Sequence, residues 1–270
     1  MRVIPALLGV LALAGCGGSE DNGSPPVVAA FYPLAWAAER IADDAVVVNL
    51  TPPGAEPHDV ELSPRDVQEI RDADLVLYVG SGFQPAVEDA VADRSGPSLD
   101  VSDSDRDPHV WLDPVRLARI VTQIARTLGR AEPGAELAAE LRRLDEDYRR
   151  GLERCERRTL VTTHAAFGHL TARYGVMQLS LSGSSPEAEP GPRELERLVN
   201  EVRDSGATTV FAEPLVSDRL AQTVAREAGV KVGVLDPIEG LSEERLSAGE
   251  DYLSVMRDNL ASLREALGCR

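Results

Sequence analysis

The residues best suited to chemistry in this chain are its histidines, which are scarce and recur in similar places. The sequence has four, and His58, His109 and His164 each lie at or just beyond the end of an expected strand, in or beside a proline-containing loop. A divalent metal held by protein alone needs about four ligands, typically imidazole nitrogens or carboxylate oxygens. Together with Asp236, which follows another expected strand, these histidines predict one metal site.

The spacing of the four candidate ligands excludes a local metal-binding finger, because neighbouring ligands are separated by about 50 residues or more. Such a site forms only when distant parts of the chain come together. Pro57, Pro108 and Pro237 adjoin three of the ligands and restrict their backbone, which favours a preformed site. Taken singly, a histidine is more often a structural or surface residue than a ligand, so the prediction depends on the whole set.

Two acidic residues are candidates for supporting roles behind the ligands. Glu213 ends an expected strand and could orient a ligand by a hydrogen bond, although a packing or capping role fits as well. Glu61 could hold the free N–H of His58. His169 lies five residues after His164, about 140° around a helix, and is therefore predicted to be structural.

The elements that must position these residues alternate between strand and helix. Such alternation predicts an α/β fold with mostly parallel sheets covered by helices, in which ligands gather at the carboxyl ends of the strands. Residues 93–107 are acidic and turn-rich and are predicted to be an exposed loop. Strands are expected at 27–32, 45–50, 74–79, 159–163, 176–181, 207–212 and 230–235, and the main helices at 33–42, 115–128, 134–154, 165–174, 192–204, 217–228 and 250–267.

The strand–helix pattern occurs twice, on either side of a charged amphipathic segment. We therefore predict two lobes, 27–132 and 155–270, joined by one long rigid helix at 133–154. About 20 helical residues span roughly 30 Å, which suits a rod between lobes. A surface helix of a single domain is the alternative.

The first residues resemble a bacterial lipoprotein signal. A short positive start, an apolar stretch and the sequence LAGC predict a signal peptide at 1–15, lipidation of Cys16 and a tether at 16–26. An ordinary secretory signal with a chance cysteine is the alternative. The lipoprotein reading places the protein in the cell envelope, anchored outside the cytoplasm on the outer face of a plasma membrane or in a periplasm.

The remaining cysteines, Cys155 and Cys269, are expected to pair, because exported proteins favour disulfides. No closely spaced cysteine pair predicts a cysteine metal site. The chain carries a net charge of −17, which argues against a nucleic-acid partner.

Five motifs, in this order and spacing, resemble the metal-binding lipoproteins of ABC importers, the zinc- and manganese-binding group of solute-binding proteins. They are GAEPHDVELSP, DPHVWLDP, LVTTHAAFGHLTARYG, VFAEPLVS and VLDPIEGL, and the similarity covers residues 27–270. The resemblance implies a monomer of two α/β lobes with the metal buried between them, working with an ABC permease and its ATPase. It also implies a disulfide like that of many zinc members at Cys155 and Cys269.

By motif position, the ligands of that family correspond to His58, His109, His164 and Asp236. Manganese members tend to have a carboxylate at the third position, whereas three imidazoles and one carboxylate suit Zn(II) better than Mn(II). We therefore predict a Zn(II)-capturing protein, with a manganese-type binder as the alternative. Unlike many zinc members, this chain has no histidine in residues 93–107.

Catalysis is not expected, because four protein ligands leave no open position for a reactive water. An exported zinc hydrolase would need a general base, for which Glu213 is the one tempting candidate. A surface adhesin is a further alternative that the sequence does not separate from metal capture. Since imidazole must be neutral to bind a metal, affinity is predicted to fall as the pH drops below about 6.

Overall fold

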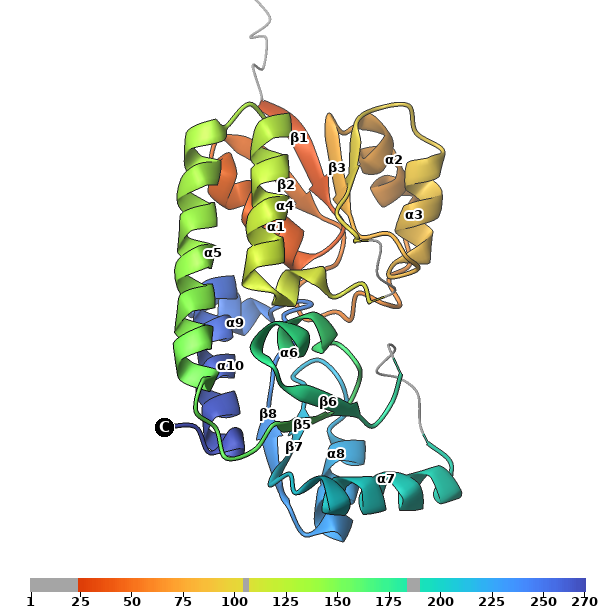
Figure 1. Cartoon of the computed structure of the whole chain (residues 1–270). Coiled ribbons are helices and arrows are strands. Elements are labelled where there is room, and N and C mark those ends of the chain that lie inside the picture. The colour runs from red at the N-terminus through yellow and green to blue at the C-terminus, as the bar shows by residue number, and fades with distance from the viewer. Residues whose placement is uncertain (1–23, 104–106, 184–189) are drawn as a thin grey trace, which may run out of the picture.

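The described strands form two parallel sheets, one in each lobe (Figure 1). The computed structural model describes residues 24–103, 107–183 and 190–270. The sheets have strand orders β2-β1-β3-β4 and β6-β5-β7-β8, so the same arrangement occurs twice, and the predicted α/β class with two lobes is confirmed. The strands are β1 (Ser24–Ala29), β2 (Ala45–Asn49), β3 (Leu75–Tyr78), β4 (Ser98–Asp100), β5 (Thr159–Thr162), β6 (Met177–Ser180), β7 (Thr209–Ala212) and β8 (Lys231–Val234).

Helices connect the parallel strands and cover the sheets. Several begin at a proline, which has no N–H to leave unpaired at a first helical position. Ser63 and Asp66 form a capping box at the start of α2. The helices are α1 (Tyr32–Ile41), α2 (Pro64–Asp72), α3 (Pro85–Ala92), η1 (Val110–Leu112, a 3-10 turn), α4 (Pro114–Thr127), α5 (Ala131–Leu152), α6 (Gly168–Tyr174), α7 (Pro192–Ser205), α8 (Arg219–Ala228), α9 (Glu243–Ser247) and α10 (Tyr252–Leu267).

The long helix α5 runs beside both lobes (Figure 1). Its 22 residues extend about 33 Å, so it reaches from α4 in the first lobe to α10 in the second. Tyr148 on α5 donates a hydrogen bond of 2.6 Å to the carbonyl of Met256 on α10. The helix expected at 133–154 is thus present, and it begins and ends two residues earlier than expected. The lobe boundaries at 132 and 155 stay a prediction.

Three expectations about individual elements are wrong. Residues 98–100, expected within a loop, form β4 and pair with β3. A short helix, α9, interrupts the loop expected before α10. The helix expected from 165 begins only at Gly168, because the backbone just after His164 bonds elsewhere: Thr162 Oγ1 and Gln178 Nε2 both donate to the His164 carbonyl.

The buried side chains form a large core and a smaller one. The large core extends through the first lobe and along α5 into the second, where it includes Phe167 and Tyr252. The small core lies wholly in the second lobe, between β5, β7, α7 and α8.

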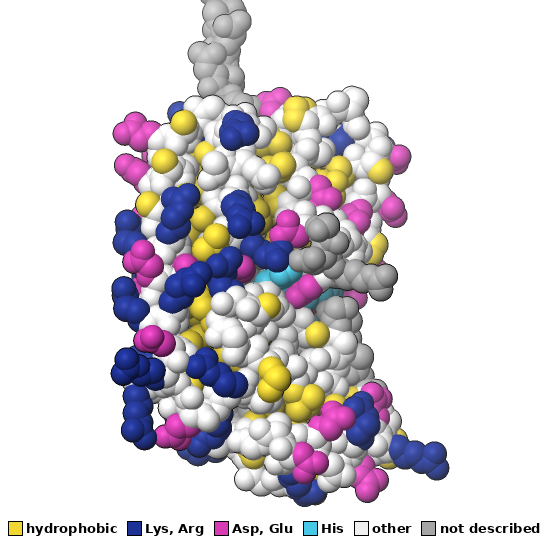
Figure 2. All heavy atoms as spheres, in the orientation of Figure 1, with side chains coloured by type: hydrophobic (Ala, Val, Ile, Leu, Met, Phe, Trp, Pro, Cys, Tyr) yellow, Lys and Arg dark blue, Asp and Glu magenta, His cyan; other side chains and the backbone are white. Residues whose placement is uncertain are grey.

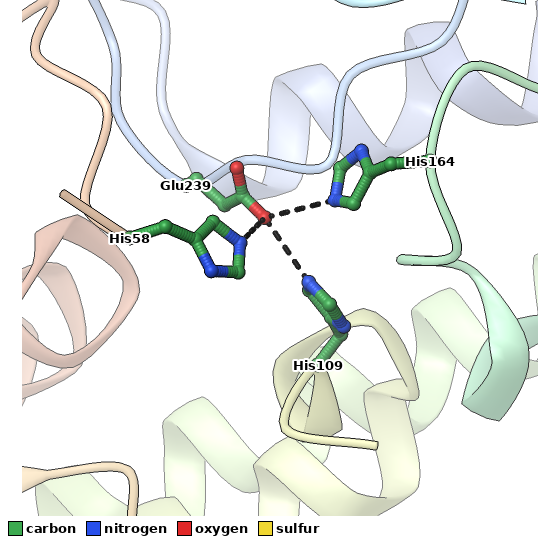
Figure 3. Close-up of side chains that lie close together, drawn as sticks. All are labelled: His58, His109, His164 and Glu239. Carbon is green, nitrogen blue, oxygen red and sulfur yellow. Dashed lines mark ion pairs between the residues drawn. The ribbon is translucent and has the colours of Figure 1, made fainter. Parts of the chain in front are cut away.

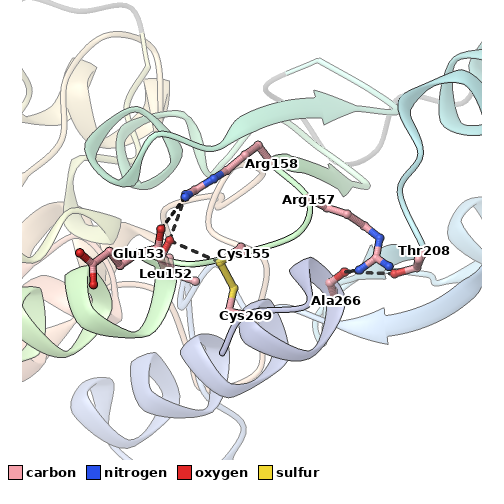
Figure 4. The surroundings of a disulfide bond; sticks show 8 residues. All are labelled: Leu152, Glu153, Cys155, Arg157, Arg158, Thr208, Ala266 and Cys269. Carbon is pink, nitrogen blue, oxygen red and sulfur yellow. Dashed lines mark hydrogen bonds between the residues drawn. A yellow bond between two sulfur atoms is a disulfide. The ribbon is translucent and has the colours of Figure 1, made fainter.

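The disulfide predicted between Cys155 and Cys269 is present (Figure 4). It joins the end of α5 to the end of α10, across 114 residues of sequence. Beside it, Arg158 donates hydrogen bonds to the carbonyls of Leu152 and Glu153, which are free at the C-terminal end of α5. The lower end of α5 is therefore fastened to the second lobe.

The predicted signal peptide, Cys16 and most of the tether lie outside the described residues. Among the helices that the structure describes, none is long and apolar enough to cross a membrane.

Candidate metal centre

Four potential ligands meet between the lobes (Figure 3): His58, His109, His164 and Glu239. One ligand atom from each lies within 4.8 Å of the others. Glu239 Oε1 is 3.4, 3.2 and 3.5 Å from the Nε2 atoms of His58, His109 and His164, respectively. Figure 2 shows that histidine side chains reach the viewed surface only at the junction of the lobes. The three predicted histidines are thus brought together.

His58 lies in the loop between β2 and α2. Its backbone N–H donates to Glu56 Oε1 at 3.2 Å, and its ring packs edge-on against Phe83, with 4.6 Å between ring centroids. The same loop contacts the second lobe, where Gly54 N–H donates to the Leu241 carbonyl at 3.0 Å. The loop that carries His58 is therefore held against the loop that carries Glu239.

His109 is the residue just before η1, and Asp107 fixes it. Asp107 Oδ1 lies 2.7 Å from His109 Nδ1 and accepts the backbone N–H of the same residue at 3.0 Å. His169, on α6 of the other lobe, contacts the Asp107 carbonyl through Nε2 at 2.9 Å. This agrees with the structural role predicted for His169. Asp107 was not singled out from the sequence, although an acidic residue two positions before a candidate ligand is a recognisable signal.

His164 follows β5, and Glu213 follows the neighbouring strand β7, so the two side chains meet at the carboxyl edge of the sheet. Glu213 Oε2 lies 2.6 Å from His164 Nδ1, and Glu213 Oε1 accepts hydrogen bonds from the His164 backbone N–H and the Thr163 hydroxyl. A carboxylate on Nδ1 leaves Nε2 facing the centre, which supports the orienting role considered for Glu213.

Asp236 does not join the cluster, contrary to the prediction. Its Oδ1 accepts the backbone N–H of Ile238 at 2.7 Å, and its Oδ2 accepts a hydrogen bond from Arg245 at 2.6 Å. The carboxylate is occupied within its own loop, and Glu239, three residues later, supplies the oxygen at the centre. In the sequence, Glu239 lies in the same motif as Asp236 and offers the same kind of ligand, so the motif alone does not separate the two residues.

Glu61 was expected to hold the N–H of His58, but it is exposed and no contact joins the two. The backbone N–H of His58 donates instead to a different acidic residue of the same loop, Glu56.

Burial and charge set the protonation of the metal-free centre. Burial alone would lower the pKa of His164, but its contacts with Glu213 and Glu239 outweigh burial and raise the pKa to about 10. The pKa of His109 is also raised, because contacts with Asp107 and Glu239 overcome burial. Burial acts to raise the pKa of Glu239, yet the three histidines hold it well below its usual range. Burial and repulsion by Glu239 raise the pKa of Glu56 to about 8.

The donor set fits a divalent metal ion. The Nε2 atoms of the three histidines and Glu239 Oε1 are buried without a hydrogen-bond partner, although they face one another. Buried polar atoms normally have partners, and a shared cation would satisfy all four at once. Three imidazoles and one carboxylate are a four-ligand set typical of Zn(II). The groups behind them, Asp107 and Glu213, fix which ring nitrogen faces inward.

Comparisons with known proteins define the class. The family model described as zinc-uptake complex component A, periplasmic, matches residues 27–266. The chain therefore belongs to the family of periplasmic components of zinc-uptake complexes, and the predicted membership of a metal-binding importer family is confirmed.

Individual relatives agree with this assignment. The chain is 31% identical to the high-affinity zinc uptake system protein ZnuA of Bacillus subtilis, with 95% of this chain and 94% of the relative covered. It is 34% identical to the zinc-binding protein AdcA of Streptococcus pyogenes serotype M1, where 90% of this chain covers only 56% of the relative. The chain thus spans little more than half the length of AdcA.

Solved structures share the fold. The Zn(II)-bound ZnuA-like domain of Streptococcus pneumoniae AdcA has a TM-score of 0.76 and 34% identity, with 91% of this chain and 99% of that chain covered. The laminin-binding protein Lmb of Streptococcus agalactiae, described as bifunctional with adhesin and metal-transporting activity, has a TM-score of 0.82 and 31% identity, with 90% and 100% covered. The relatives described here are named for binding, uptake or adhesion rather than for catalysis.

Proposed function

We propose that this protein captures Zn(II) outside the cytoplasm and delivers it to an ABC permease driven by its ATPase. The observation that carries the proposal is the meeting of His58 and His109 from one lobe with His164 and Glu239 from the other. The proposed ligands are these four, in place of a set that includes Asp236.

The choice of zinc follows from the donor atoms. Mn(II) prefers more oxygen ligands, whereas this centre offers three imidazole nitrogens and one carboxylate. The Zn(II)-bound state of the AdcA domain, which is 34% identical to this chain, supports the same choice. The chain itself offers four donors, the full ligand number of a structural Zn(II) site, so the centre is suited to holding an ion rather than to activating water.

We also propose that lipidation of Cys16 anchors the protein in the cell envelope, with residues 16–26 as tether and lobes at 27–132 and 155–270. A monomer would suffice, because one chain supplies all four donors. The zinc-binding lipoprotein AdcA of Streptococcus pneumoniae serotype 4, 33% identical over 98% of this chain and 60% of that relative, supports the anchor by its name.

Metal competition tests the proposal directly. Residues 17–270 are stripped of metal, offered equal Zn(II) and Mn(II), desalted and analysed by mass spectrometry. We expect one zinc per chain. Preference for manganese would overturn the selectivity, and absence of bound metal would overturn the function.

The ligand assignment is tested with Glu239→Gln. Glu239 is 1% exposed, and breaking a buried charge pair costs about 3–5 kcal/mol, so zinc affinity should fall at least about 100-fold. Glu227→Gln, on the exposed surface of α8, is the matched control and should bind as the wild type does. A deletion strain should regain growth under zinc limitation with the wild-type gene but not with Glu239→Gln.

A further inference from the structure

The loop between β8 and α9, residues 235–242, carries Glu239 and is here called the Glu239 loop. Both lobes hold its backbone. Asn259 on α10 accepts the Asp236 N–H at 2.9 Å and donates to the Asp236 carbonyl at 2.7 Å. From the other lobe, Trp111 Nε1 donates to the Pro237 carbonyl at 2.7 Å. Asp236 and Pro237 are therefore fixed in place.

The next residue, Ile238, has a left-handed backbone with φ of +56° and is completely buried. This conformation is unfavourable for a β-branched residue and persists only where the surroundings impose it. Asp236 Oδ1 imposes it by accepting the Ile238 N–H. Because Glu239 comes directly after this turn, the turn sets the direction in which the Glu239 side chain leaves the backbone.

Arg245 on α9 holds the other oxygen of the same carboxylate. Its guanidinium donates to Asp236 Oδ2 at 2.6 Å and, through Nε, to Glu250 Oε2 at 2.8 Å. Asp236 is buried and Arg245 is one-quarter exposed, so the pair is shielded from water. Asp236 lies close enough to Glu239 for their negative charges to repel. Without Arg245, the Asp236 carboxylate would lose its cationic partner while that repulsion remained.

We propose that Arg245 is a positioning residue for the metal centre: by holding Asp236, it maintains the left-handed turn at Ile238 and thereby places the Glu239 carboxylate among the three histidines. The proposal rests on the proposed function, in which Glu239 is a zinc ligand. It gives Asp236 a role in building the loop and gives α9 a role in metal affinity, although neither supplies a donor atom at the centre.

A double-mutant cycle tests whether Arg245 acts through Glu239. Zinc affinity is measured by chelator competition on residues 17–270 as wild type, Arg245→Gln, Glu239→Gln and the double variant. Groups behind metal ligands typically change affinity by about 10- to 100-fold, so Arg245→Gln should weaken zinc binding at least about 10-fold. In the Glu239→Gln background the same change should cost less than about 2-fold, because the ligand it positions is already lost.

Further variants separate positioning from folding. Arg245→Lys keeps the charge beside Asp236 and should recover most of the affinity. Arg226→Gln, on exposed α8, is the control arginine and should have no effect. In the Co(II)-loaded protein, the visible absorption band should lose intensity with Arg245→Gln and regain it with Arg245→Lys, since that band reports ligand geometry. Circular dichroism verifies that each variant is folded.

Two results would overturn the inference while leaving the proposed function intact. In one, Arg245→Gln binds zinc as tightly as the wild type. In the other, Arg245→Gln weakens zinc equally in both backgrounds, so that Arg245 acts independently of Glu239. If the wild type itself binds no zinc, the proposed function fails, and this outcome is distinct from the other two.

Discussion

Raising the pH should destabilise the metal-free protein and at the same time strengthen its binding of zinc. In the metal-free centre, contacts with Glu213 and Glu239 raise the pKa of His164 to about 10, above its ordinary value of 6.5. A group whose pKa is raised on folding adds stability that is complete below its unfolded pKa and is lost as the pH rises through its folded pKa. The metal-free protein should therefore lose stability between about pH 6.5 and 10.

The size of the effect follows from linkage. One such group changes the free energy of unfolding by up to about 1.4 kcal/mol per pH unit, so His164 alone contributes up to about 2.7 kcal/mol between pH 7 and 9. For a protein of this length, that corresponds to about 5–10 °C in Tm. The raised pKa of His109 acts in the same direction. Glu56, with its pKa raised to about 8, contributes only below that pH, so the interval from pH 8 to 9.5 reports on the histidines.

Zinc offsets this loss of stability, because the ion binds neutral imidazoles. Each proton that zinc displaces strengthens binding about tenfold per pH unit while the free group remains protonated. The Tm increase caused by zinc should consequently grow from pH 7 to 9. The fall in affinity on acidification should also start above the pH of about 6 expected for an unperturbed histidine.

Calorimetry of chelator-treated and zinc-loaded protein at pH 7, 8, 9 and 9.5, with free zinc set by a metal buffer, measures both the Tm of the metal-free protein and the increase caused by zinc. Glu239→Gln should flatten the slope of the metal-free protein, because it removes the carboxylate shared by the three histidines. A metal-free Tm that stays constant or rises between pH 8 and 9.5 would refute the reasoning.

Three further outcomes follow from single contacts. Glu213→Gln, which removes the charge behind His164 Nδ1, should weaken zinc binding about 10- to 100-fold in a chelator competition, and an unchanged affinity would contradict the orienting role. Gly168→Ala would place a Cβ 2.5 Å from Asp107 Oδ2, so it should displace Asp107 from His109 and weaken zinc about tenfold, whereas the unobstructed Gly183→Ala should not. Replacing both cysteines of the disulfide by serine should lower the free energy of unfolding by about 4–5 kcal/mol in urea titrations; a loss below about 1 kcal/mol would mean that the bridge does not constrain the unfolded chain.

The sequence predicted the fold and the meeting of the three histidines because both follow from regular signals. Strand–helix alternation determines the layers, and histidines at strand ends are directed to one edge. The sequence placed Asp236 beside the histidines, where the structure has Glu239, because the two residues share one loop and one chemistry. Which of them faces the centre depends on Arg245 and on the left-handed turn at Ile238, neither of which has a local sequence signature.

The start of α6 and the strand β4 were predicted wrongly for a related reason. Residues 165–167 look helical in sequence but form bends and turns, because Thr162 and Gln178 donate hydrogen bonds to the His164 carbonyl just before them. Strand β4 has only three residues, and it is defined by pairing with β3 rather than by its own composition. Contacts between residues distant in sequence determine the structure of both segments, and the intrinsic helix or strand propensity of the residues does not reflect such contacts.

The large core that passes from one lobe into the other makes the two lobes one cooperative unit. Tyr148 on α5, Phe167 before α6 and Tyr252 on α10 all belong to it, so pulling the lobes far apart would expose apolar surface to water. Wide hinge opening would thus approach the cost of partial unfolding. Release of an ion would cost less if only the loops carrying His58 and Glu239 separated, because the core shared by the two lobes would then stay buried.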